Sequence, residues 1–204
     1  MKKPGKNTLL MSVIMSSPGP IVIGLGLMVG QSSTQLADFV RRSIELVAII
    51  LSFFVFCLTS KENYDDNKRR RLEKNNNLFV SCSMIISGII MILIALIFPS
   101  EDKGNVIPGL VIAGLGVTAN SIFWIRYKIL GNKSLNTILI TQSKLYRAKT
   151  FVDASVVLAL FVVLVSQDKN VSFYFDLVGT VCVSLYLIYT GITTLFKELK
   201  GEKI

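Results

Sequence analysis

Charged side chains interrupt two of the most apolar stretches of the sequence. One stretch contains Arg41-x-x-x-Glu45, and another contains Lys149-x-x-x-Asp153. A spacing of four residues places the base and the acid of each pair on one face of an α-helix, one turn apart. Charges in apolar surroundings are costly unless they are paired or hydrated, so each pair is a candidate functional site.

Four further polar residues fall in or beside such stretches. Asp38 lies one turn before Arg41 and Arg42, so these residues can share a helix face with Glu45. Asn120 lies inside another apolar stretch, where its amide could hydrogen-bond to a neighbouring helix, and Asp176 lies near the start of the last one. We predict that Asp38, Arg42, Asn120 and Asp176 line a pathway to the two charge pairs.

The residue types exclude several kinds of site. The chain has no histidine, so no imidazole can bind a metal or act as a general base. Cys57, Cys82 and Cys182 lie far apart in apolar stretches, which predicts small buried side chains and neither a metal site nor a disulfide framework. Because no nucleophile constellation or phosphate-binding glycine loop is present either, we do not expect an enzyme.

The composition indicates a membrane protein. Of 204 residues, 51% are hydrophobic and only 17% are charged, whereas a soluble domain averages about 25% charged residues. Apolar stretches long enough to cross a bilayer occur six times. They lie at about 9–30, 35–58, 77–98, 106–127, 150–166 and 172–195.

The connections between these spans alternate in length and charge. We expect short polar hinges after the first, third and fifth spans, and longer connections at 59–76 and 128–147. Pro18 and Pro20 must break or kink the first span. Of the 22 Lys and Arg residues, 17 fall on the two tails or in and beside the two longer connections, while the other side has only Lys103 and Lys169. This asymmetry predicts that both termini are cytoplasmic.

The basic residues explain the net charge of +9 without a nucleic-acid partner, because positive charges beside spans fix topology and contact anionic lipid headgroups. We therefore predict an all-α membrane protein, with residues 1–204 forming a single six-transmembrane-helix bundle in the lipid bilayer. The residue usage and the lack of an organelle signal suit a bacterial inner membrane.

The order of these features resembles the cation diffusion facilitator family of divalent-metal/proton antiporters. The likeness lies in six spans with both termini inside and in acidic motifs early in the second and fifth spans. Residues 31–38 resemble the family's entry into its second helix, 77–90 its small-residue third helix, and 174–189 its sixth. The resemblance implies that this chain corresponds to the family's transmembrane domain without the cytoplasmic metal-sensing domain. It also implies a homodimer, for which we expect the small-residue face of the third span (Ser83, Ser87, Gly88) to supply the interface.

The resemblance places the family's four transport-site positions at Arg41, Glu45, Lys149 and Asp153. In each pair the acid is retained, and the first ligand is replaced by a cation. Because Arg does not lose its proton in proteins, only Glu45 and Asp153 could hold a metal, and only weakly. No cofactor is expected; a divalent metal, a monovalent cation and an organic ion all remain open as substrates.

Two functions fit these residues. The first is a secondary transporter that couples cation efflux to proton entry by alternating access, with Lys149 exchanging a proton and Arg41 acting as a tethered cation. The second is a transport-inactive relative in which the two charge pairs form a fixed ionic lock, acting as a scaffold or regulator of a partner. The neutral sum of the four charges suits the lock, whereas the low stabilising value of buried ion pairs argues against a purely structural role.

Overall fold

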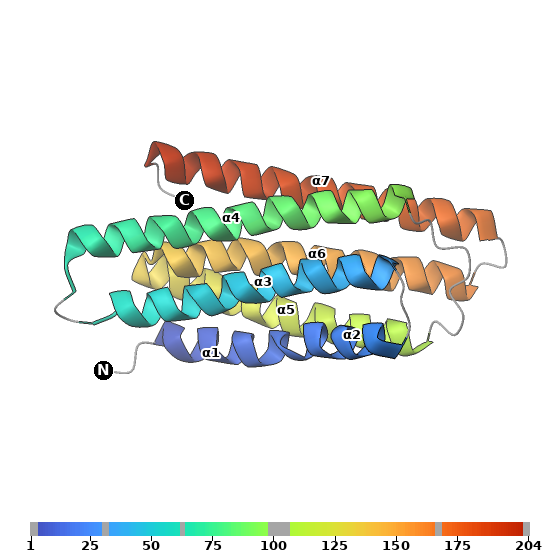
Figure 1. Ribbon diagram of the computed structural model, residues 1–204, viewed down its shortest axis with the longest axis horizontal. Helices are drawn as coiled ribbons and strands as arrows, with labels where there is room; N and C mark the ends of the chain where they lie inside the picture. Colours follow the sequence, from blue (N-terminus) through green and yellow to red (C-terminus); the bar gives the residue numbers. More distant parts are fainter. Residues whose placement is uncertain (1–3, 30–32, 62–63, 98–106, 166–168, 202–204) are drawn as a thin grey trace.

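The described part of the chain forms seven α-helices, of which α3 to α7 run lengthwise along the bundle (Figure 1). The computed structural model describes residues 4–29, 33–61, 64–97, 107–165 and 169–201, and these contain no β-strand. The predicted all-α class is therefore confirmed for this part of the chain. The helices are α1 (Pro4–Ser16), α2 (Pro18–Val29), α3 (Ser33–Thr59), α4 (Asp66–Ile97), α5 (Ile107–Ser134), α6 (Thr137–Val165) and α7 (Lys169–Lys200).

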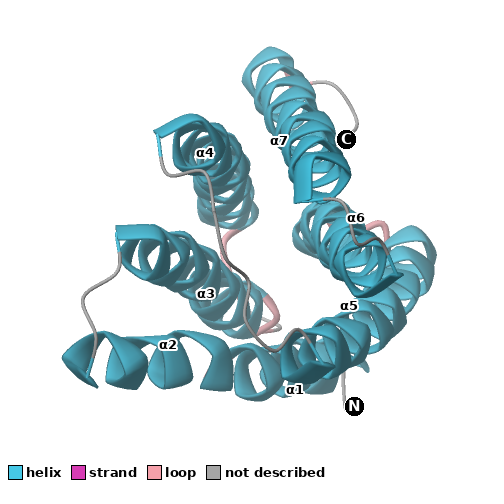
Figure 2. Cartoon of the chain, turned by 90° about the vertical axis from the view of Figure 1, so that its right-hand side faces the viewer, coloured by secondary structure: helices cyan, strands magenta, loops and turns pink. Residues whose placement is uncertain are grey.

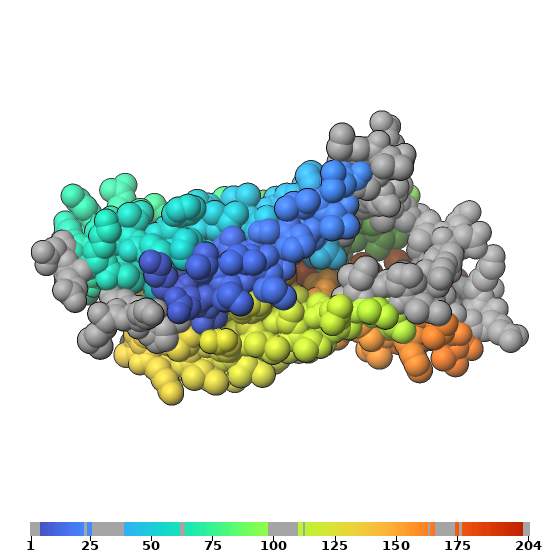
Figure 3. Space-filling model, turned by 90° about the horizontal axis from the view of Figure 1, so that it is seen from below, coloured from blue at the N-terminus to red at the C-terminus, as the bar shows by residue number. Residues whose placement is uncertain are grey.

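The first predicted span is broken in two, as its prolines require. The backbone amide and the hydroxyl of Ser17 both donate to the carbonyl of Val13, at 3.0 and 2.7 Å, and α1 ends there. Pro18 then begins α2, a position where its missing amide costs nothing. Figure 3 shows the two helices lying obliquely across the bundle: α1 contacts both α3 and α5, while α2 packs on α3.

Most of each predicted long connection is helical. Residues 66–76 belong to α4, and 128–134 and 137–147 extend α5 and α6, so that only Leu135 and Asn136 separate these two helices. Asn136 caps α6 by accepting a hydrogen bond from the amide of Leu139 at 3.2 Å. Hydropathy detects the apolar part of each helix, but it cannot detect the polar turns that extend the helix beyond the membrane.

The interior of the bundle combines a hydrophobic core with many polar side chains, and its exterior is apolar. Among the described residues, polar side chains outnumber apolar ones in the buried set, while large side chains such as Leu96, Leu115 and Phe161 point outward. Within the residues that the structure describes, three helical segments are long and apolar enough to cross a membrane: Phe39–Thr59, Asp66–Ile97 and Leu177–Lys200. Helix α1 begins and α7 ends at the same end of the bundle (Figure 1); the six-span topology and the cytoplasmic location of this end remain predictions.

Helices α4 and α7 are neighbours in the bundle, which Figure 2 shows along its length, and they pack closely against each other. A Cβ added at Gly88 would lie 2.7 Å from Ile188 Cγ1 and 2.8 Å from the Ser184 carbonyl oxygen, and one added at Gly191 would lie 2.9 Å from the Ser81 carbonyl oxygen. Small residues on both helices therefore permit this contact.

Two predictions about these helices and the cysteines are wrong. The face expected to form a homodimer interface (Ser83, Ser87 and Gly88) is buried inside the protomer, with Gly88 against α7, because its small residues are used within the chain. The cysteines are also not all buried: Cys57 is half-buried, and Cys82 and Cys182 are exposed on the outer surface. A thiol is apolar enough to face lipid, so an apolar stretch alone does not predict burial.

Candidate functional site

Arg41 and Glu45 form a buried ion pair on α3. Arg41 Nη1 lies 3.1 Å from Glu45 Oε1, and the two residues are only 6% and 2% exposed. The other face of the helix carries exposed apolar side chains, including Val47, Leu51 and Phe54. An apolar outer face and a charged inner face orient α3 so that the ion pair points into the bundle.

Lys149 of α6 reaches across the bundle to the same carboxylate. Its Nζ lies 3.5 Å from Glu45 Oε2 and 5.2 Å from the centroid of the Tyr146 ring, one turn earlier on α6. Glu45 is therefore held between two cations, one through each carboxylate oxygen, and it links α3 to α6. The negative face of the aromatic ring adds a favourable contact for the ammonium group.

Asp153 is held by α5. Asn120 Nδ2 donates a hydrogen bond to Asp153 Oδ2 at 2.6 Å, which is the cross-helix bond expected of Asn120. Gly116 lies one turn before Asn120, and a Cβ added there would lie 2.7 Å from Asp153 Oδ2. A glycine at this point therefore makes room for the carboxylate against α5. The sequence analysis missed Gly116, and its spacing of four from Asn120 is the signal that could have found it.

The charges of the two predicted pairs gather in one region of the bundle. Arg41, Arg42 and Lys149 all lie within electrostatic range of Asp153, and the side chain of Arg42 lies beside Gly19 of α2. The formal charges of Arg41, Glu45, Lys149 and Asp153 sum to zero, and Arg42 adds one positive charge. The side chains of Asp38 and Asp176 fall outside the described residues, so their predicted place on the pathway stays a prediction.

Two tyrosines pack next to Lys149, Tyr146 directly and Tyr127 against Tyr146. Tyr146, whose ring faces the ammonium group, shares a 3.0 Å hydrogen bond with Ser16 of α1. Tyr127 of α5 shares a 2.6 Å hydrogen bond with Ser12 of α1, and the two tyrosine rings lie 5.3 Å apart between centroids. Both tyrosines are fully buried. This set of contacts ties α1, α5 and α6 together next to the charged cluster, and the sequence analysis did not identify it.

An uncharged polar layer lies two helical turns from the charged cluster, toward the end where α1 begins. Gln142 Nε2 of α6 donates to Ser52 Oγ of α3 at 2.7 Å, and Ser52 Oγ lies 3.0 Å from Asn76 Oδ1 of α4. Ser52 follows Glu45 by seven residues and Gln142 precedes Lys149 by seven, so both layers occupy the same helix faces. Gln142 Oε1 and Asn76 Nδ2 are buried without a hydrogen-bond partner in the described part of the chain.

The residues present do not build a conventional metal centre. Within the described ranges, no group of three or more Cys, Asp or Glu residues could hold a metal ion. Both oxygens of Glu45 already face cations, so an incoming metal would have to displace Lys149 or compete with Arg41. The described residues therefore do not offer a tight metal-binding site.

The comparison with protein families identifies the scaffold. A family model described as the cation efflux transmembrane domain matches residues 9–200. The chain belongs to the cation efflux family. Comparison with curated proteins gives no match. Membership in this family makes the chain an integral membrane protein of the cation transporter type. Its environment is the lipid bilayer, and its substrate class is cations.

Proposed function

We propose that this cation efflux domain is a secondary transporter that exports a cation in exchange for protons, with Glu45 and Asp153 attracting the cation. The observation that carries the proposal is a buried carboxylate held between two cations from different helices. Apolar packing stabilises a protein at least as well as buried ion pairs, so cohesion alone does not call for them. Buried charges of this kind are typical of ion pathways in membrane proteins.

Charge accounting favours a monovalent substrate. When Lys149 gives up its proton, the ammonium group 3.5 Å from Glu45 Oε2 becomes neutral, and the total charge of the cluster falls by one. One monovalent cation restores the original charge. A divalent cation would leave the cluster one charge more positive than before, next to Arg41 and Arg42, in surroundings that screen charge poorly. We therefore propose one-for-one exchange, with divalent metals held weakly and no resident cofactor.

Each residue then has a defined role in alternating access. Lys149 carries the proton, and Arg41, which keeps its charge, stays with Glu45 when the substrate leaves. Asn120 orients Asp153 toward the cluster. The layer of Ser52, Asn76 and Gln142 closes the path on the side where α1 begins. Opening that side requires α3 and α6 to separate, and only side-chain contacts have to be exchanged for this to happen.

A second candidate function rests on the same carboxylate. Because both Glu45 oxygens are already paired, the cluster could be a permanent lock in a transport-inactive protein that serves as a scaffold or regulator. In either case we propose that the chain is not an enzyme and that it forms one domain over residues 1–204. We also propose a location in a bacterial inner membrane with both termini cytoplasmic, and, if the chain is a homodimer, an interface other than the Ser83–Gly88 face.

Proton flux in proteoliposomes separates the two functions. Vesicles holding a pH-sensitive dye are exposed to Na⁺, K⁺, Mg²⁺, Mn²⁺, Fe²⁺, Co²⁺ and Zn²⁺ one at a time. We expect flux with a monovalent ion, and we expect Asp153→Asn to abolish it because the neutral amide no longer attracts the cation. Lys149→Met should retain ion binding but lose proton movement. The control is Glu73→Gln, which removes a carboxylate that accepts a hydrogen bond from Thr137, 3.2 Å away, far along α4 from the site.

The outcomes of this experiment are distinct. Flux that survives in Asp153→Asn would remove the proposed site. No flux with any ion from folded wild-type protein would favour the ionic lock. Flux with divalent ions alone would keep the transporter and refute the charge argument for a monovalent substrate.

A further inference from the structure

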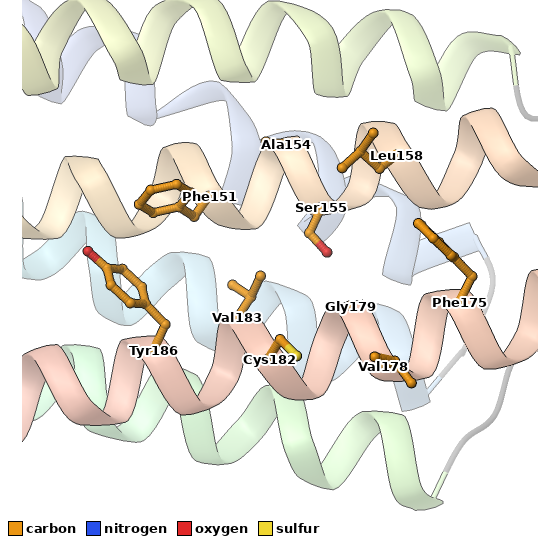
Figure 4. Close-up of a pocket in the computed structure, with 10 residues that line it drawn as sticks. All are labelled: Phe151, Ala154, Ser155, Leu158, Phe175, Val178, Gly179, Cys182, Val183 and Tyr186. Atoms are coloured by element: carbon orange, nitrogen blue, oxygen red, sulfur yellow. The ribbon is translucent and has the colours of Figure 1, made fainter.

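An apolar groove runs along the outer surface between α6 and α7 (Figure 4). Its volume is about 440 Å³, and its walls are formed by side chains of both helices. Phe151 and Tyr186 lie at one end, and Leu158 and Phe175 lie at the other. Along α6 the groove is roughly 10 Å long at 1.5 Å per residue. Leu158 and Phe175 are 56% and 44% exposed, so the groove opens toward the lipid.

Small residues between large ones create this groove. Ala154 and Ser155 of α6 face Gly179 of α7 in its middle, and a Cβ added at Gly179 would lie 2.9 Å from Ser155 Oγ. At the end nearer the chain termini, the Phe151 and Tyr186 rings meet edge to face with centroids 5.1 Å apart. The result is a narrow groove with an aromatic side chain at each end, and it fits one flexible hydrocarbon chain better than a bulky side chain.

A positively charged side chain lies at the Phe151–Tyr186 end of the groove. The Arg147 guanidinium lies 5.6 Å from the centroid of the Tyr186 ring, one helical turn beyond Phe151 on α6. Arg147 is only partly buried, so part of this charged side chain is accessible beside the groove. A guanidinium group held next to an aromatic ring, at the end of an apolar groove, points to an anionic ligand.

Two lysines add to this positive charge. Lys144 lies one turn before Arg147, and burial together with the charges of Lys197 and Arg147 lowers the pKa of Lys144 to about 8. The nearby acid, Glu198, accepts a hydrogen bond from Asn77 of α4. Three cations thus gather at one end of an apolar groove, at the membrane face where the sequence predicts anionic headgroups.

We propose that this groove binds an anionic phospholipid, with one acyl chain between α6 and α7 and the phosphate on Arg147 and Lys144. The combination of a narrow apolar channel with a cationic mouth matches the two halves of such a lipid. A second copy of the chain fits less well, because a two-fold contact through the groove would bring two sets of the same cations to the same depth in the membrane. The proposal does not depend on transport.

The single tryptophan reports on the groove without labelling. The Trp124 ring lies 6.3 Å from that of Phe151, so a brominated acyl chain in the groove should quench its fluorescence. The protein is reconstituted in phosphatidylcholine vesicles containing rising fractions of brominated phosphatidylglycerol or brominated phosphatidylcholine. We expect half-maximal quenching at an about tenfold lower fraction of the anionic lipid, because several cations meet its headgroup.

Two variants test the two halves of the site. Arg147→Gln should remove the preference for phosphatidylglycerol, while Arg126→Gln, which removes an exposed arginine of α5, should keep it. Ala154→Phe leaves the cations in place but fills the groove, and it should reduce quenching by phosphatidylglycerol to the level of phosphatidylcholine. Equal quenching by both lipids in the wild type, or equal loss in Arg147→Gln and Arg126→Gln, would overturn the proposal. Efficient disulfide cross-linking between copies through Cys182 would also overturn it and assign the groove to a dimer.

Discussion

The α4–α7 and α3–α6 contacts hold the bundle together in opposite ways. Helices α4 and α7 meet at their backbones, since Gly88 and Gly191 leave no room for even a methyl group. Helices α3 and α6 share few close backbone contacts and are joined through long side chains, with Glu45 meeting Lys149 and Ser52 meeting Gln142.

The difference indicates which parts of the molecule can move. A backbone contact between small residues is either made or broken, because neither surface can adjust its shape. Contacts through long polar side chains can be exchanged for others as the helices shift, at little cost if every charge finds a new partner. We therefore regard α4–α7 as the fixed wall, and we expect the α3–α6 contact to change in the proposed transport.

The largest effect is expected from breaking the polar contact on one side only. Glu45→Gln leaves Arg41 and Lys149 buried without their carboxylate, and we expect the free energy of unfolding to fall by about 3 kcal/mol. Equilibrium unfolding in detergent measures this change. Glu73→Gln, on the exposed end of α4, should cost less than about 1 kcal/mol. Equal losses in the two variants would mean that Glu45 is not the partner of two buried cations.

Removing all three members of the Glu45 ion pairs sharpens the same comparison. When Arg41, Glu45 and Lys149 are all changed to Met, no cation is left facing a missing Glu45 carboxylate, and Asp153 keeps the hydrogen bond from Asn120 and the nearby charge of Arg42. Stability should therefore return to within about 1 kcal/mol of the wild type. If the cluster serves transport, this stable protein should carry no proton flux. If the cluster is only a lock, the triple variant should lose little besides its rigidity. A triple variant as unstable as Glu45→Gln would show that the charges themselves hold the bundle.

Breaking the backbone contact should have a smaller but clear effect. Gly88→Ala forces a methyl group against Ile188 and the Ser184 carbonyl, and we expect a loss of about 2 kcal/mol from overpacking. Gly114→Ala is the matched control, because a Cβ there meets nothing within 4 Å. This control should be neutral or stabilising, since Ala favours a helix over Gly by up to about 1 kcal/mol. Similar melting of the two variants would refute the fixed wall.

The sequence predicted the features that depend on local chemistry. The break before Pro18 follows from its missing amide, and the orientation of Arg41 and Glu45 on one face follows from their spacing of four. The cross-helix bond of Asn120 was also expected, because an isolated amide in an apolar helix needs a partner.

The features that were missed depend on neighbours far away in the chain. The family resemblance led us to expect that the two charge pairs meet, but the ion-pair partner of Lys149 is Glu45 on α3, and no spacing within α6 encodes that choice. The polar turns of α4, α5 and α6 remain helical because adjacent helices support them beyond the apolar part. The use of Ser83, Ser87 and Gly88 inside the protomer likewise depends on Gly191, more than 100 residues later.

The smallest effect concerns the end of the bundle where α6 meets α7. Lys144 Nζ donates to Thr194 Oγ1 at 3.2 Å, and burial, then the charges of Lys197 and Arg147, lower its pKa from 10.5 to about 8. Between these two pH values the unfolded chain holds a proton that the folded chain has lost, so the free energy of unfolding should rise with pH. Because the side chain is only half-buried, we expect a rise of about 1 kcal/mol.

Lys144→Met tests this contribution against the background of other titrating groups. The variant should be more stable than the wild type at pH 7, and the difference should shrink as the pH rises through the window, because the wild-type lysine then loses the charge that burial and its neighbours disfavour. Lys128→Met, at an exposed position of α5, should follow the wild-type pH profile. A difference between Lys144→Met and the wild type that stays constant with pH would mean that the methionine acts through packing, and that the α6–α7 end carries its positive charges without cost.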